Sequence, residues 1–363
     1  MIIIVIKQYE YCLIKENEMV KKLRILFRTA GGSAKNKELG TGHIFRCINL
    51  ANQLRKHKIF FVIEDFGGVE KILYDNNFTE IIILKQDISV KEDIIQTTKI
   101  IKKHKIDLVI VDKINTKKTF LEKLKTNAFT VYISDLKKIE YPSHLIINGF
   151  VGLKNGIIYN KYKSKCLLGP HYQILAKSNL KKNKIKKKYD LLVTFGGYDA
   201  NNIIDKFCYE LEKFSDKLRV KIIIGISTKK TSYIRKIEKF SNSIEIINFT
   251  KNLQREIHES KFGLCSGGIT TYEFASAKIP FAIICQYPHQ KLTAKEWEKR
   301  GYAINLGIAD KKLPIKINKF LSNLIQNKIK ISIDQSIIDR MGGKRVANFI
   351  LKSYYQAQLK KRK

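Results

Sequence analysis

Residues 261–307 hold the most informative group of side chains in the chain. A short apolar strand, Phe262 to Cys265, runs into Ser266-Gly267-Gly268, and a helix is predicted to begin near Thr270. Glycine lets a ligand come close to the backbone, and the first amides of a helix are unpaired donors at the positive end of its dipole. This turn therefore predicts a binding site for an anion.

Further polar groups follow in the same stretch. Glu273 is expected in the first turn of the helix, where its carboxylate could accept hydrogen bonds from both hydroxyls of a ribose. Replacing it by Ala should then weaken nucleotide binding and leave the melting temperature nearly unchanged. A second strand, Phe281 to Cys285, leads to His289 and Gln290 and then to another helix. Because parallel strands end at one edge of a sheet, these groups are expected to line one ligand site. The alternative is an ordinary strand–glycine–helix turn without a ligand.

A second glycine-rich turn follows the first strand of the chain. The run Gly40-Thr41-Gly42-His43-Ile44-Phe45-Arg46 stands at a predicted helix start. Gly42 lets the loop pass close to a ligand, and the helix dipole disfavours an imidazolium at His43, which suits a neutral base or donor. Arg46, one turn later, either faces the same ligand or pairs with an acid. The alternative for His43 is a structural histidine whose hydrogen bonds are satisfied within the fold.

The elements that must position these turns are alternating strands and helices. Continuous apolar runs are typical of strands buried on both faces of a parallel sheet. Repeated β–α units imply parallel sheets with right-handed crossovers. The predicted fold class is therefore α/β, with two Rossmann-like domains around a central cleft. The predicted strands are 23–27, 59–63, 81–84, 108–111, 130–133 and 145–147, then 191–195, 220–224, 244–247, 262–265, 281–285 and 303–306.

The domain boundaries follow from composition. Residues 1–18 precede a natural first strand and are interpreted as an extension. Residues 19–178 form the predicted first domain, a polar and basic segment at 179–188 is the linker, and residues 189–363 form the second domain. The apolar start is short and is not followed by a small-residue cleavage site, so we do not expect a signal peptide.

The chain of 363 residues has a formal net charge of +36. This excess is interpreted first as a residue bias spread over solvated faces, and second as attraction to an anionic substrate or membrane surface. Zinc-finger, RRM-type and helix-turn-helix signatures are lacking, so dedicated nucleic-acid binding is not predicted. The six cysteines are scattered, which argues against a zinc site or a disulfide framework and fits a cytoplasmic protein. No acidic D-x-D pattern occurs, so neither a metal nor another cofactor is predicted.

Together these motifs carry a resemblance. The segments LFRTAGG, GTGHIFRCINLANQL, CLLGPHYQIL, LLVTFGGYDANN and RMGGKRVANFI, with residues 261–307, resemble the hydrolase of pseudaminic acid biosynthesis and its spore-coat-polysaccharide relatives. That hydrolase removes UDP from UDP-2,4-diacetamido-2,4,6-trideoxy-β-L-altropyranose. The order S-G-G-x-T-x-x-E also resembles the UDP-sugar half of MurG-type glycosyltransferases. The resemblance spans about residues 23–346 and implies a GT-B fold.

The resemblance also implies roles for individual residues. His43 would be the catalytic acid/base, the second domain would hold UDP, and the sugar would face the first domain. The fourth strand ends in Asp112-Lys113-Ile114 where the hydrolase has an Asp-His-Tyr run, so Asp112 is retained and the Tyr hydroxyl is not. His289-Gln290 replaces an Asn-Gln pair. The implied substrate- and UDP-binding residues are Gly42, Arg46, Asp112, Gly196, Gly197, Ser266, Gly268, Thr270, Glu273, His289 and Gln290.

Three functions stay open at this point. The first is a hydrolase that releases UDP from a modified deoxy sugar, with His43 activating water. The second is a glycosyltransferase that passes the sugar to a glycan or lipid acceptor at the inner membrane surface, favoured by Ile114 and the basic charge. The third is a non-catalytic nucleotide-sugar or nucleic-acid binder, against which the two glycine-rich motifs speak.

Overall fold

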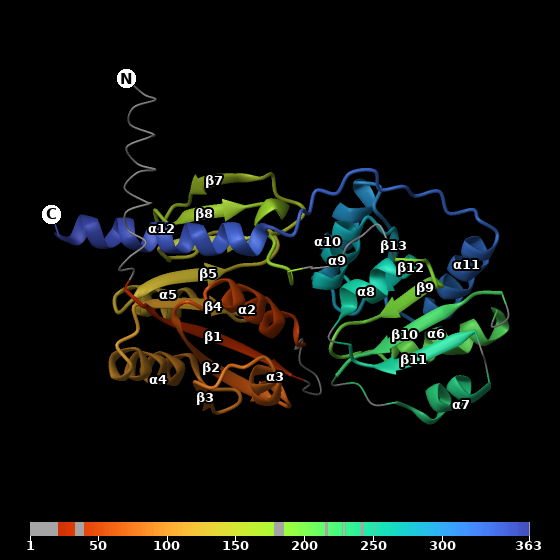
Figure 1. Ribbon diagram of the computed structural model, residues 1–363, viewed down its shortest axis with the longest axis horizontal. Helices are drawn as coiled ribbons and strands as arrows, with labels where there is room; N and C mark the ends of the chain where they lie inside the picture. Colours follow the sequence, from red (N-terminus) through yellow and green to blue (C-terminus); the bar gives the residue numbers. More distant parts are fainter. Residues whose placement is uncertain are drawn as a thin grey trace, which may run out of the picture.

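The computed structural model describes residues 21–32, 40–177, 185–214, 217–226, 228, 230–240, 243–250 and 252–362. The predicted extension at 1–18 and residues 179–184 of the predicted linker lie outside the described residues. The described chain forms two sheets, each with helices packed on it, and the two halves lie side by side (Figure 1).

The first sheet has the strand order β3-β2-β1-β4-β5-β6-β8-β7. Neighbouring strands run parallel except for the antiparallel pair β7–β8. Its strands are β1 (Arg24–Gly32), β2 (Lys58–Phe66), β3 (Ile81–Leu84), β4 (Leu108–Asp112), β5 (Phe129–Ile133), β6 (Leu145–Asn148), β7 (Gly156–Tyr159) and β8 (Lys165–Leu168). The accompanying helices are α2 (Gly42–Gln53), α3 (Val69–Asp75), α4 (Val90–Lys103), α5 (Lys118–Lys125) and the 3₁₀ turn η2 (Pro170–Tyr172).

The second sheet has six parallel strands in the order β11-β10-β9-β12-β13-β14. This is the same order as that of β3-β2-β1-β4-β5-β6 in the first sheet. Its strands are β9 (Tyr189–Thr194), β10 (Val220–Ile224), β11 (Ile244–Asn248), β12 (Ser260–Cys265), β13 (Phe281–Cys285) and β14 (Ala303–Ile308). Its helices are α6 (Ile203–Leu211), η4 (Glu212–Phe214), α7 (Ser232–Phe240), α8 (Leu253–His258), α9 (Ile269–Ala277), α10 (Gln290–Lys299) and α11 (Leu313–Ile325).

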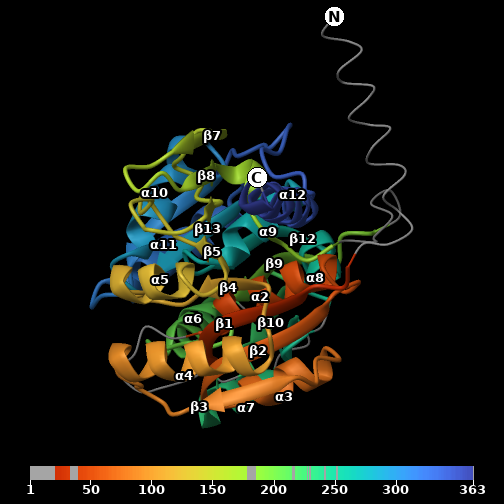
Figure 2. The ribbon, with the colours of Figure 1, turned by 90° about the vertical axis from the view of Figure 1, so that its left-hand side faces the viewer.

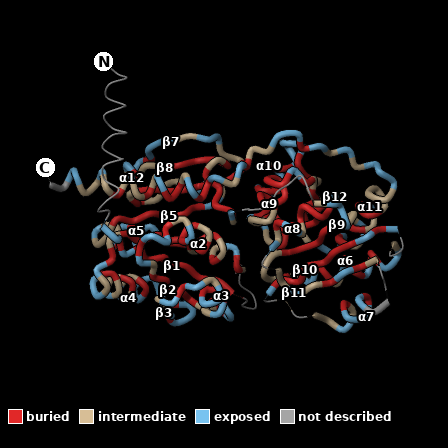
Figure 3. Tube along the Cα trace, viewed as in Figure 1, coloured by how far each residue is buried: buried red, intermediate tan, exposed pale blue. Residues whose placement is uncertain are grey.

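The apolar runs form strands because both faces of each sheet are covered. In β1, Ile25 and Phe27 enter the core beneath α2, whereas Leu26 enters the core on the α4 and α5 side. Figures 2 and 3 show the same arrangement, with helices on either side of the sheets and the burial concentrated in the strands. All twelve predicted strands are present. The sequence analysis missed β7 and β8, which are short, and Ile157, Ile158 and Tyr159 of β7 are exposed rather than buried.

The last helix, α12 (Gly342–Arg362), corrects the predicted domain division. The sequence analysis placed it in the second domain, within 189–363. Instead it crosses back and lies along the first half (Figure 1), where Val346, Ala347, Ile350 and Tyr354 complete the core beneath α2. An apolar stripe shows that a helix packs somewhere but not on which core, so composition could not decide this. No described helix, α12 included, has both the length and the hydropathy needed to cross a bilayer.

The strand order creates one switch point in each sheet, between β1 and β4 and between β9 and β12. Ligands of open α/β sheets bind outside the carboxyl ends of strands at such points. Both switch points open onto one cleft of about 970 Å³. The two halves touch beside it: Phe45 stacks on Phe249 with ring centroids 6.1 Å apart, and the Val151 amide donates to the Tyr272 hydroxyl at 3.1 Å.

Candidate active site

The cleft brings the two glycine-rich turns together. The turn after β1 and the turn after β12 face each other, and a Cβ added to Gly42 would lie 3.7 Å from Ile269 at the start of α9. Ten of the eleven predicted binding residues line the cleft with His43, and Asp112 does not. The lining ten are Gly42, Arg46, Gly196, Gly197, Ser266, Gly268, Thr270, Glu273, His289 and Gln290.

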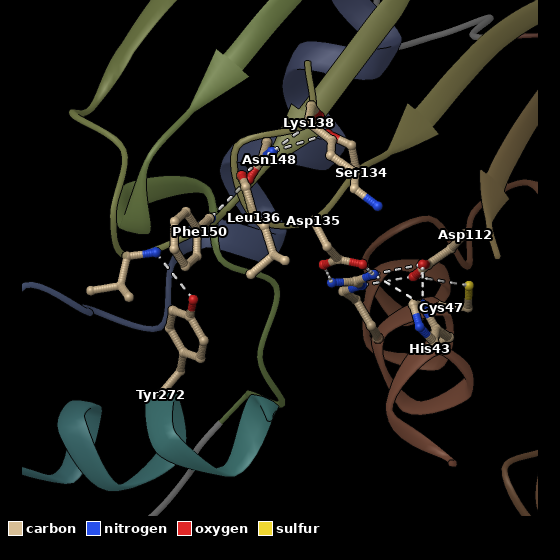
Figure 4. Close-up of polar contacts among 12 residues, drawn as sticks. His43, Cys47, Asp112, Ser134, Asp135, Leu136, Lys138, Asn148, Phe150 and Tyr272 are labelled. Atoms are coloured by element: carbon tan, nitrogen blue, oxygen red, sulfur yellow. Dashed lines mark hydrogen bonds and ion pairs between the residues drawn. The ribbon is translucent and has the colours of Figure 1, made fainter. Parts of the chain in front are cut away.

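His43 is the second residue of α2 and forms a short contact with the end of β4. Its Nδ1 lies 2.6 Å from Oδ1 of Asp112 (Figure 4). The Nη2 atom of Arg46 lies farther from the same nitrogen, at 3.1 Å. The shorter distance to an ionised carboxylate favours the tautomer in which Nδ1–H donates to Asp112. In that tautomer Nε2 is the unprotonated nitrogen and can accept a proton.

Asp112 requires a correction, because it is fully buried and cannot bind the ligand directly. Burial by itself would raise the pKa of this carboxyl, but Arg46 and His43 lower it well below the usual range. Asp112 therefore stays ionised and orients His43. This geometry resembles the arrangement in which a buried carboxylate fixes the tautomer of a catalytic histidine.

Arg46 lines the cleft and pairs with acids, the second of the two roles that the sequence analysis left open. Its Nε and Nη2 donate to the two oxygens of Asp112 at 2.7 and 2.6 Å. Its Nη1 and Nη2 donate to Asp135 at 2.7 and 3.1 Å, which leaves the guanidinium almost entirely buried. No spacing signal in the sequence links Asp135 to Arg46.

Among the described residues, one group of three could hold a metal ion by residue type and distance. It consists of His43, Asp112 and Asp135, whose donor atoms lie within 4.8 Å of one another. Arg46 already binds both carboxylates bidentately. A guanidinium between the two acids supplies the positive charge that a metal ion would otherwise provide. The donor set therefore fits an arginine-centred ion network better than a metal site.

The second-domain turn offers a ligand backbone amides rather than charged side chains. Gly268 precedes α9, whose first turn has no side-chain cap, and the position of its missing Cβ has only Ser266 Oγ nearby, at 3.9 Å. Gly196 has φ +79° and an open position where a Cβ would lie, whereas Gly197 packs against Thr41 of the first half. Uncapped amides beside open glycines are the features on which the prediction of an anion site rests.

Gln290 and His289 stand at the start of α10. The side-chain oxygen of Gln290 accepts hydrogen bonds from the amides of Gln286 at 2.8 Å and Gly267 at 3.3 Å. A Cβ at Gly267 would approach Gln290 Cβ to 2.7 Å. Gln290 therefore holds the two loops of the anion site together, and His289 stacks on Tyr287 at its rim.

Glu273 departs from expectation in two respects. It is the fifth residue of α9, in the second turn rather than the first. Its carboxylate forms an ion pair at 2.5 Å with Arg340 and accepts a hydrogen bond from Gln254. Arg340 also donates to Ser276 and to the carbonyl of Ala176, where the chain passes between domains. Burial raises the pKa of Glu273 although Arg340 opposes the shift.

A second charged cluster lies behind the first-domain turn and was missed by the sequence analysis. The fully buried Arg28 donates to Asp93 at 2.9 and 2.8 Å and to Glu64 at 2.6 Å. Lys113, at the cleft, forms ion pairs with the same two acids at 2.9 and 2.5 Å. Alternation along the strand end explains the division, because Asp112 faces α2 and Lys113 faces α4.

Asp199 stands two residues after Gly197 of the second-domain half. Its carboxylate accepts the amides of Ile203 and Ile204 at the start of α6, at 2.9 and 2.8 Å. It is therefore a helix cap. The described cysteines are free and buried, and Cys47, Cys265 and Cys285 are core residues.

The architecture is a GT-B fold: two doubly wound α/β domains that face each other across a cleft. MurG of Acinetobacter baumannii superposes with a TM-score of 0.57 at 14% identity, covering 91% of this chain and 99% of MurG. The predicted fold class is confirmed.

Family relationships follow from sequence. Residues 191–341 match the glycosyltransferase family 28 C-terminal domain. The spore coat polysaccharide biosynthesis protein SpsG of Bacillus subtilis is 26% identical over 286 residues, covering 75% of this chain and 81% of SpsG. A UDP-2,4-diacetamido-2,4,6-trideoxy-β-L-altropyranose hydrolase of Campylobacter jejuni is 25% identical, covering 78% of this chain and 98% of the hydrolase. The resemblance is confirmed: the chain is similar to these two proteins over most of its length, and its second half matches the family 28 C-terminal domain.

Proposed function

We propose that this protein is a nucleotide-sugar enzyme of surface-glycan biosynthesis, and that it releases UDP from a UDP-linked acetamido-deoxy sugar with His43 as the acid/base. The observation that carries the proposal is the 2.6 Å contact between His43 Nδ1 and the buried Asp112 at the edge of the cleft. Support also comes from the name of SpsG, a spore coat polysaccharide biosynthesis protein, and from that of the Campylobacter hydrolase.

Electrostatics sets the proposed orientation of the substrate. The diphosphate would bind at the start of α9, near Gly268 and Gly196, where amides are available and acidic side chains are paired. The start of α2 lies beside Asp112 and Asp135, two carboxylates that share the single guanidinium of Arg46, and the net negative charge that remains would repel phosphate. The sugar would therefore face His43.

The proposed step is a displacement at the anomeric carbon. His43 Nε2 accepts a proton from water as the water oxygen bonds to that carbon. The bond from the carbon to the phosphate oxygen breaks, and its electron pair leaves with UDP. Asp112 holds the imidazole in place and stabilises the imidazolium that forms. The helix dipole of α9 and its free amides stabilise the charge that develops on the leaving diphosphate.

Transfer to an acceptor is the second candidate, and the lining of the cleft favours it. Besides His43, the lining includes Asn49 and Asn52 of α2 and Asn76 directly after α3. These amide side chains would bind an acceptor whose hydroxyl takes the place of water. Ile114 stands two residues after β4, at the position where the resemblance implies a Tyr in the hydrolase, so that hydroxyl is missing here.

The deciding experiment measures UDP release from candidate UDP-acetamido-deoxy sugars by the purified chain, first alone and then with glycan or lipid-phosphate acceptors. Release without acceptor supports hydrolysis, and release that needs an acceptor supports transfer. Ile114→Tyr is the matched variant, since it restores the hydroxyl and should raise acceptor-free release if the chain is a hydrolase. Absence of both activities with every UDP-sugar, together with absence of UDP binding, would refute the proposal.

A further inference from the structure

A group of exposed lysines lies beside the first-domain rim of the cleft. It is formed by three segments: the loop into α5, the loop after β5, and the turn between β7 and β8. We name this surface the basic face, and its six lysines are Lys117, Lys118, Lys137, Lys138, Lys161 and Lys163.

Hydrogen bonds and ring contacts join the three segments into one surface. The side-chain amide of Asn160 donates to the carbonyls of Ile139 and Tyr141, at 2.7 and 2.9 Å, and so fixes the β7–β8 turn to the loop after β5. The ring of Tyr162 lies 5.4 Å from Lys118 Nζ and 5.5 Å from Lys161 Nζ, and so joins that turn to α5. The basic face is therefore a fixed feature of the fold.

The charges of the basic face are not neutralised within the described chain. All six lysines are exposed, and none forms an ion pair with a described residue. The neighbouring Lys113 is different, because Glu64 and Asp93 bind it. The nearby Asp135 is bound by Arg46, and the carboxylate of Glu140 accepts a hydrogen bond from the backbone amide of Lys161. Six lysines held together with one acid among them, Glu140, favour a polyanionic partner.

Apolar side chains adjoin the basic face. Ile157, Ile158 and Tyr159 of the edge strand β7 are 44%, 43% and 68% exposed, and they lead directly into Lys161. Exposed aliphatic and Tyr side chains next to lysines suit the boundary between lipid headgroups and acyl chains. A nucleic acid would use the charge but would leave Ile157 and Ile158 in water.

We propose that the basic face and β7 dock this enzyme on an anionic lipid surface. Clusters of four to eight basic residues are a typical size for recognition of acidic headgroups, and each contributes on the order of 1 kcal/mol close to the surface. Asn115, Lys138 and Tyr141 belong to the same segments and also line the cleft. Docking in this way places the mouth of the cleft next to the membrane, within reach of a lipid-borne substrate or acceptor. The inference goes beyond the proposed chemistry and does not depend on it.

The test is sedimentation of the full chain with vesicles of equal parts phosphatidylglycerol and phosphatidylcholine, and with phosphatidylcholine alone. We expect binding to the anionic vesicles only. The variant K117E/K161E/K163E should bind at least about a hundredfold more weakly, given the contribution per lysine. Ile158→Asp should weaken the binding that remains at high salt.

The matched control is K311E/K319E/K328E, which makes the same change of charge on exposed lysines of the second domain. It should retain vesicle binding. Equal loss in both triple variants, or no binding of the unaltered chain to anionic vesicles, would overturn the proposal, as would DNA binding without vesicle binding. Soluble glycerol phosphate at millimolar concentration should not displace the chain, and displacement would identify a free-phosphate site instead. UDP release from a soluble UDP-sugar should be the same in both triple variants, so a failure of docking is separate from a failure of the proposed reaction.

Discussion

The two glycine-rich turns have similar local sequences but opposite electrostatic surroundings. Both precede a helix without a side-chain cap, α2 in the first domain and α9 in the second. The start of α2 is surrounded by side-chain charge: His43 is bound to Asp112, and Arg46 is bound to Asp112 and Asp135. The start of α9 offers mainly backbone amides and open glycines. A helix start becomes an anion site only where its amides are not already facing carboxylates.

This difference divides the work of the proposed reaction. Proton transfer needs an oriented titratable group, which the α2 turn supplies. Binding of a diphosphate needs unpaired donors, which the α9 turn supplies. The substitutions below test whether the division is real, and they are ordered from the largest expected effect to the smallest.

His43→Ala should remove the proton acceptor from the α2 turn and leave the α9 turn intact. We expect UDP release on the true substrate to fall by roughly 10²–10⁴-fold. UDP affinity, measured by calorimetry, should stay close to that of the unaltered chain. His43→Asn should be nearly as inactive, because it retains a hydrogen-bond donor but cannot transfer a proton. Full turnover in either variant would make His43 a structural residue.

Asp112→Asn should leave His43 in the chain but remove the carboxylate that fixes its orientation. The amide no longer fixes the Nδ1–H tautomer, and a comparable change in a buried aspartate–histidine pair lowers kcat by up to about 10⁴. We expect a large loss in kcat, a small change in KM and an altered dependence of kcat on pH. A loss confined to KM would instead indicate direct substrate binding by Asp112, which its burial argues against.

Glu273→Ala should show how much Glu273 contributes to the stability of the folded chain. Removing one partner of a buried ion pair costs about 3–5 kcal/mol, so the variant should unfold at lower urea concentration. The sequence analysis expected a nearly unchanged melting temperature without foreseeing Arg340, and the ion pair now predicts a lower one.

Arg340→Lys separates the two roles of Glu273. It keeps a cation beside the carboxylate, and Arg340 does not line the cleft. If Glu273 binds the ribose, Glu273→Ala should lose UDP affinity and Arg340→Lys should retain it. Equal affinity in both variants and the unaltered chain would restrict Glu273 to holding the domain crossing.

The charge network of the first domain should also be visible in acid unfolding. Arg46 and His43 lower the pKa of Asp112 against the effect of burial. Arg28 and Lys113 do the same for the pKa of Asp93. A depressed folded pKa contributes stability that is complete above the unfolded value, about 3.9, and is lost as pH falls below it. The unaltered chain should therefore lose stability below about pH 4. Asp112→Asn should lose less over that interval, as followed by urea unfolding.

The sequence predicted the fold well because its signals are local. Each buried parallel strand is a continuous apolar run, and each glycine-rich turn stands directly after such a run, so twelve strands and the places of both turns could be identified. β7 gave no comparable signal, because Ile157 to Tyr159 form an exposed edge. The sequence likewise held no signal for the domain on which α12 packs, since its apolar stripe fits either core.

The sequence by itself determined which residues stand at the carboxyl ends of the strands, and therefore that His43, Gly196, Ser266 and Gly268 share one cleft. Only the tertiary structure decided how their charges are paired. Asp112 lies 69 residues from His43, and Arg340 lies 67 residues from Glu273. Long-range ion pairs leave no periodic trace in a sequence, because they depend on the register of neighbouring strands and on where the chain crosses between domains. For that reason the sequence indicated the right turns, whereas the roles of Arg46, Asp112 and Glu273 required the fold.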